Sequence, residues 1–115
     1  MIQVVLCFDS ESLLRSCTVE GHAGQGPVGA DIVCAAASVL ARTGLKTLVR
    51  EGVDVRAEAP QRGHFSIVTN TQEGGQAALR TVGVFLEEGF ASLAQEYPDA
   101  LTLDIRSEWR NYHGS

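Results

Sequence analysis

The sequence predicts an α/β (α+β) fold: a small two-layer sandwich with a mixed or antiparallel sheet and two helices on one face. Short segments of alternating apolar and polar residues occur in pairs, and two longer segments carry apolar residues at helical spacing. These segments follow one another in the order ββαββαβ, an arrangement typical of a sheet covered on one side. With 115 residues and no repeat, linker or low-complexity stretch, we expect a single domain over 1–115.

The first two strands are expected to form a hairpin. Residues 2–8 alternate with a period of two, which is typical of a strand. Residues 9–12 have the composition of a turn, and residues 13–20 then read as the second strand.

A helix is expected from about Ala30, after a glycine-rich stretch in which no regular element is predicted. Its apolar residues recur at helical spacing, while Arg42 lies on another face. Gly44 either ends this helix or weakens it.

The second half of the chain repeats the pattern. Residues 53–59 and 64–70 read as two strands, and a longer helix is expected after Gly74-Gly75. Pro98 ends that helix, and residues 101–106 alternate again as a fifth strand. The core stripe of the second helix consists of Leu79, Val82, Leu86, Phe90 and Leu93.

Charge and composition narrow the classes of partner. Nine Lys and Arg residues stand against 14 Asp and Glu residues, which disfavours nucleic acid and suits a basic protein or peptide. No run of 18 apolar residues occurs, so no membrane-spanning helix is expected. Met1 is followed by neither a basic region nor a small-residue cleavage site, and we therefore expect a cytoplasmic protein.

The cysteines and histidines indicate no disulfide and no metal site. Three cysteines, an odd number, in a chain with no export signal are expected to be reduced thiols. Neither a Cys-x-x-Cys pair nor closely spaced histidines supply zinc ligands, so no cofactor is expected.

The segment most informative about chemistry is GHAGQGPVGADIVCAAAS, residues 21–38. A helix N-terminus favours a thiolate, and Cys34 is expected in the first turn of the first helix. His22 lies 12 residues earlier at the end of a strand, and the loop between them is long enough to bring the two side chains together. Amides of the loop and the helix start are candidates for holding an oxyanion. From the residues alone, a cysteine among small apolar residues is more often a buried packing residue.

Two residues near Cys34 have alternative roles. Asp31 is interpreted first as the N-cap of the helix and alternatively as the group that orients His22. Ser38, one turn after Cys34, either forms a hydrogen bond inside the site or bonds back to the carbonyl of Cys34.

The glycine-rich loop is predicted to act as a lid. Gly24 and Gly26 leave residues 23–28 many backbone conformations, so the loop is expected to be mobile until a substrate supplies contacts. Gly21 and Gly29 flank it as candidate hinges. If Gly21 has backbone angles that Ala cannot adopt, a Gly21→Ala exchange is expected to impair turnover and spare stability.

The run Gly21-His22-Ala23, followed by Gly29, the stretch 31–36 and Ser38, resembles the signature of the ribosomal-processing cysteine protease family (Prp). The resemblance implies that His22 and Cys34 form a catalytic dyad. It also implies a small α/β sandwich that forms a homodimer. The implied substrate is a large-subunit ribosomal protein precursor, whose N-terminal extension the enzyme removes.

Alternative functions and residue roles also remain open. The alternative function is a non-catalytic ribosome-associated factor that binds a basic ribosomal-protein tail; a thiol redox protein is a third, disfavoured by the lack of a nearby resolving cysteine. Cys7 and Cys17 are interpreted as packing residues in strands. His64 is interpreted as a surface or edge residue, and Trp109 and Tyr112 lie in a tail that could pack on a partner subunit.

Overall fold

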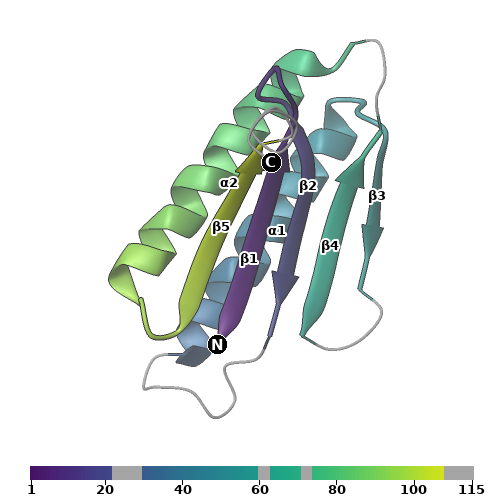
Figure 1. Ribbon diagram of the computed structural model, residues 1–115. Helices are drawn as coiled ribbons and strands as arrows, with labels where there is room; N and C mark the ends of the chain where they lie inside the picture. The colour runs from purple at the N-terminus through teal and green to yellow at the C-terminus, as the bar shows by residue number, and fades with distance from the viewer. Residues whose placement is uncertain (22–29, 60–62, 71–73, 108–115) are drawn as a thin grey trace.

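The computed structural model describes residues 1–21, 30–59, 63–70 and 74–107. Within these residues the elements are β1 (Ile2–Phe8), β2 (Leu14–Glu20), α1 (Ala30–Arg50), β3 (Val55–Glu58), β4 (His64–Thr69), α2 (Gln76–Glu96) and β5 (Leu101–Ser107). The strands form one sheet in the order β3-β4-β2-β1-β5, and both helices lie on the same face of it (Figure 1). The predicted two-layer α+β fold and the ββαββαβ order are confirmed.

The sheet is mixed. β1 pairs with β2 in an antiparallel hairpin and with β5 in parallel. The hairpin turn is organised by Asp9, whose carboxylate oxygen Oδ1 accepts hydrogen bonds from the backbone N–H groups of Glu11 and Leu13, at 2.8 and 3.0 Å. This is the local side-chain-to-backbone bonding that makes Asp a frequent turn residue.

β4 pairs antiparallel with β2, although a helix and a strand separate them in the sequence. The register places Val19 opposite Phe65 and Glu20 opposite His64. The end of β2 and the start of β4 therefore meet at one end of the sheet, beside the N-terminus of the chain (Figure 1).

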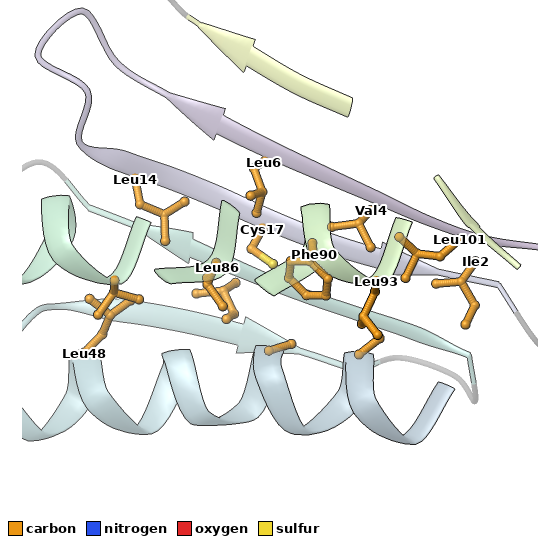
Figure 2. Packing of buried hydrophobic residues seen from close by; sticks show 14 of the residues in the cluster. Ile2, Val4, Leu6, Leu14, Cys17, Leu48, Leu86, Phe90, Leu93 and Leu101 are labelled. Carbon is orange, nitrogen blue, oxygen red and sulfur yellow. The ribbon is translucent and has the colours of Figure 1, made fainter. Parts of the chain in front are cut away.

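One apolar layer fills the space between the sheet and the helices. Figure 2 shows side chains from both strands and helices directed into this layer, with the Phe90 ring near its middle. The residues with at most 1% of their surface exposed include Ile2, Val4, Leu6, Leu14, Cys17, Leu48, Ile67, Leu86, Phe90 and Leu101. The predicted stripe on the second helix faces this layer, since all five of its residues are buried.

The two helices approach each other closely at glycines. Gly44 lies inside α1, where a Cβ atom would stand 3.1 Å from Leu86 of α2. In the same way, a Cβ atom on Gly89 of α2 would stand 2.9 Å from Leu40 of α1. Gly44 therefore does not end the first helix, which continues to Arg50. Its role is to make room for a side chain of the other helix.

α1 has a high mean hydropathy, although it contains no uninterrupted run of 18 apolar residues. Among the described residues, its segment Asp31–Arg50 is long and apolar enough to span a membrane, with a mean hydropathy of 1.5. A core helix of a folded domain meets the same criterion, and α1 buries Val33, Ala37, Ala41 and Leu48 in the apolar layer. Length and composition alone therefore do not assign this helix to a membrane.

Cys17 should give the stability of the fold a dependence on alkaline pH. Burial, with a smaller effect of the neighbouring Cys7, raises the pKa of the Cys17 thiol from 9.0 to about 12. The unfolded chain releases this proton first, so the stabilisation is complete below pH 9.0 and is lost as the pH rises towards 12. The slope is about 1.4 kcal/mol per pH unit.

Urea unfolding of the wild type and of Cys17→Ala, at about pH 8 and about pH 10.5, measures this contribution by difference. The wild type should lose more stability than the variant between the two conditions. Equal losses in the two proteins would contradict the assignment.

Candidate active site

A pocket of about 490 Å³ opens at the end of the sheet where β2 ends and β4 begins. Its volume falls in the range typical of ligand sites in proteins. The wall consists of the first turns of α1 on one side and strand ends on the other. The lining residues are Ile2, Val19, Gly21, Cys34, Ala37, Ser38, Ala59, Gly63, His64 and Phe65.

Cys34 reaches this pocket because of how α1 packs. Val33 and Ala37 are at most 1% exposed and hold the first turns of the helix against the sheet. Cys34 follows Val33 around the helix, so it lies at the margin of the core, half-buried, with part of its surface facing the pocket. Of the three cysteines, all of which the structure describes, Cys34 alone lines the pocket.

The start of α1 agrees with the sequence prediction and bears on the role of Asp31. The helix begins at Ala30, so Asp31 lies within its first turn and not at the N-cap. Cys34 is accordingly the fifth helical residue, just past the first turn. Asp31 is exposed and is not among the lining residues, whereas Ser38 lines the pocket one turn after Cys34. The two roles proposed for the Ser38 hydroxyl both stay predictions.

His22 and the loop lie outside the described residues, as do Gly24, Gly26 and Gly29, so the dyad and the lid stay predictions. The tail with Trp109 and Tyr112 also lies outside them. The structure does define the chain up to Gly21, whose backbone N–H donates a 2.8 Å hydrogen bond to the carbonyl oxygen of Gly63. The residue before His22 is thus tied to the rim of the pocket that Cys34 lines.

His64 was missed as a site residue by the sequence reading. It lines the pocket with Cys34, and its Nδ1 atom lies 2.9 Å from Oε1 of Glu20, its partner across the β2–β4 ladder. The only signal in the sequence is that Gly63-His64 repeats the dipeptide Gly21-His22. No pattern in the sequence predicts that β2 and β4 pair in the sheet.

The remaining cysteines differ in their environment. Cys17 is fully buried in the apolar layer, as expected for a packing residue, and the raised pKa keeps its thiol protonated at neutral pH. Cys7 is half-buried and points to the opposite face of the sheet, since it alternates with the buried Leu6. Among the residues that the structure describes, no group of three His, Cys, Asp or Glu side chains could hold a metal ion.

Comparison with known proteins identifies the family to which this chain belongs. Residues 1–102 match the family model described as cysteine protease Prp. No curated protein sequence matches.

Several solved structures share the fold. A Streptococcus mutans protein, SMU.848, is 26% identical, with a TM-score of 0.77 over 93% of this chain and 95% of its own. Also similar is the essential ribosomal processing protease Prp from Staphylococcus aureus. Its complex with a substrate peptide is 24% identical, with a TM-score of 0.73, and its complex with a covalently linked product peptide is 27% identical, with a TM-score of 0.65. Each of these two matches covers 92% of this chain and all of the other.

The expectation that Gly21→Ala spares stability is overturned by the structure. Gly21 has a φ of +113°, which L-residues rarely adopt, and a Cβ atom there would overlap the carbonyl oxygen of Met1. We therefore expect Gly21→Ala to lower the free energy of unfolding by at least about 2 kcal/mol, since backbone strain and a clash combine.

Gly52→Ala is the matched control for this effect. Gly52 also has a positive φ, +79°, but a Cβ atom there would meet nothing within 4 Å. Its substitution should cost only the strain of about 1 kcal/mol. If urea unfolding gives the same loss for both variants, the close contact between Gly21 and Met1 does not constrain the strand end.

Proposed function

Because this chain belongs to the cysteine protease Prp family, we propose that it is an endopeptidase in which Cys34 is the nucleophile and His22 the general base and acid. The observation that carries the proposal is the place of Cys34 in the wall of an open pocket at the start of a helix, one residue from the core contact of Val33. The hydrogen bond between Gly21 and Gly63 supports it, because Gly21, the residue before His22 in the sequence, lies at the same rim.

The reaction that these residues perform is acyl transfer. His22 takes the thiol proton, the sulfur of Cys34 forms a bond to the scissile carbonyl carbon, and the carbon–nitrogen bond breaks as His22 returns the proton to the leaving amine. Water, activated by the same imidazole, then releases the acyl group from Cys34. Amides near the start of α1 and in the preceding loop are the proposed donors to the oxyanion.

The proposed substrate is the N-terminal extension of a large-subunit ribosomal protein precursor. The Staphylococcus aureus relative is a ribosomal processing protease, which supports this class of substrate. The charge distribution supports a basic polypeptide. Near the pocket end of the molecule, the described charged side chains are acidic: Glu20, Asp31, Glu58, Glu96 and Asp99. Of the described Lys and Arg residues, Arg42 bonds to a lining residue, because its Nε donates a 3.3 Å hydrogen bond to the carbonyl oxygen of Ser38. The others belong to the middle or the opposite ends of their helices and strands.

Assembly and location are proposed from the sequence expectations. A homodimer is supported by exposed apolar side chains on α1, where Ile32 and Val39 lie two turns apart and are 64% and 54% exposed. We also propose that the protein acts in the cytoplasm, where ribosomal proteins are made.

The alternative is a factor that binds a ribosomal-protein tail without cutting it. It differs from the peptidase in one respect that can be measured, because binding requires no reactive thiol. The Cys34 side chain therefore discriminates between the two.

Cys34→Ala should abolish cleavage and leave the fold intact. Alanine fills the same half-buried position, so the melting temperature should change little, while removal of the nucleophile should lower the rate by at least about 1000-fold. The assay is incubation with the ribosomal protein of the same organism followed by intact-mass analysis. Cys17→Ala is the control and should retain cleavage, since Cys17 is buried and does not line the pocket. A Cys34→Ala rate within about tenfold of the wild type would contradict the nucleophile assignment.

His22→Ala should reduce both cleavage and the reactivity of Cys34. A neighbouring imidazole accepts the thiol proton, so without it less thiolate is present at neutral pH. The measurement is the rate of Cys34 alkylation by iodoacetamide, followed by peptide mass analysis, in the wild type and in the variant. His113→Ala is the control, since it removes an imidazole that the proposed mechanism does not use. Identical alkylation rates in the wild type and His22→Ala across pH would count against a coupled dyad.

A further inference from the structure

The residues that line the pocket include some whose side chains point to opposite faces of the sheet. Val19 and Phe65 pack against the core on the helix side, and the next pair in the ladder, Glu20 and His64, points to the opposite face because side chains alternate along a strand. His64 nevertheless lines the pocket together with Cys34. The rim of the pocket therefore includes the strand ends, where the two faces of the sheet meet.

Two glycines form part of this rim. Gly21 and Gly63 both line the pocket where the strands end, and neither has a side chain to close the rim. Gly21 in addition holds a backbone conformation that L-residues rarely adopt. Among the described residues, these two glycines offer no side chain that would block a polypeptide with its scissile bond at Cys34 from extending to His64.

Glu20 holds the imidazole of His64 in a defined orientation. The distance of 2.9 Å between Nδ1 of His64 and Oε1 of Glu20 is that of a hydrogen bond, and a carboxylate can only accept, so Nδ1 carries the proton. Nε2 is then left to pair with the backbone of a peptide, as an acceptor from N–H when the ring is neutral and as a donor to a carbonyl oxygen when it is protonated.

We propose that His64 is a substrate-contacting residue of this site, forming a hydrogen bond through Nε2 with the backbone of the bound polypeptide, and that Glu20 is its positioning residue. This inference rests on the proposed peptidase function and extends it. A purely structural role explains the pair poorly, because the two side chains are 25% and 52% exposed, and ion pairs with that exposure contribute little to stability.

The test separates binding from cleavage. A fluorescently labelled peptide from the N-terminus of the organism's own ribosomal protein is titrated into Cys34→Ala protein, and its Kd is compared with the Kd for Cys34→Ala/His64→Ala. Loss of one hydrogen bond should weaken binding by roughly fivefold or more. In proteins that retain Cys34, His64→Ala should raise KM by a similar factor and leave kcat and the iodoacetamide reactivity of Cys34 within about threefold of the wild type.

Glu20 is tested by a graded pair of variants. Glu20→Gln keeps an oxygen that accepts from Nδ1 and should retain most of the affinity, whereas Glu20→Ala should weaken binding in the direction of His64→Ala. The matched control is Asp104→Ala. It removes a 2.9 Å pair with Arg106 on the same face of the sheet, through a carboxylate about as exposed as that of Glu20 but away from the pocket, and should leave the Kd unchanged.

Each outcome decides a separate point. Equal Kd values with and without His64, or a fall in kcat at constant KM, would overturn the substrate-contact role. Equal affinity of Glu20→Gln and Glu20→Ala would overturn the positioning role. Absence of cleavage by the wild-type protein would instead refute the peptidase proposal, while the Kd comparison would still decide the role of His64.

Discussion

Two helices must share one face of a five-stranded sheet, and the close contact between them is the constraint on which the rest of this structure depends. Leu86 occupies the space above Gly44, and Leu40 occupies the space beside Gly89, so each helix offers a glycine to a leucine of the other. Protein interiors are packed to near-crystalline density, and a methyl group at either glycine would force a displacement. This reciprocal fit brings both helices onto the layer that contains Phe90.

The position of α1 in turn determines what its first turns present to solvent. Val33, Ala37 and Ala41 form a buried seam with small side chains, which lets the helix lie close to the sheet. Residues next to that seam fall at the edge of the core, and Cys34 and Ser38 are two of them. The thiol is thus partly covered on the core side and open on the pocket side, which a reactive cysteine requires.

The opposite wall of the pocket depends on strand pairing. β2 and β4 run antiparallel and end together, so Gly21, Gly63 and the pair Glu20 and His64 meet at one end of the sheet. In an ordered β-sheet such a cross-strand pair keeps its geometry without a large contribution to stability. The rigid framework therefore supplies orientation at the site, while the apolar layer beneath supplies stability.

The sequence by itself determined the elements and the candidate nucleophile. The spacing of apolar residues along 2–8 and from Leu79 to Leu93 predicts which face of each element is buried. This works because the strand and helix periods depend only on local backbone geometry. The run around Cys34 carried enough specific residues to resemble a cysteine protease family, and the family match confirms that resemblance. Only the tertiary structure decided that Gly44 lies inside a helix, that Gly21 presses against Met1, and that His64 lies in the same pocket as Cys34. Each of these depends on contacts between segments far apart in the chain, and local periodicity contains no information about which strands pair or which helices touch.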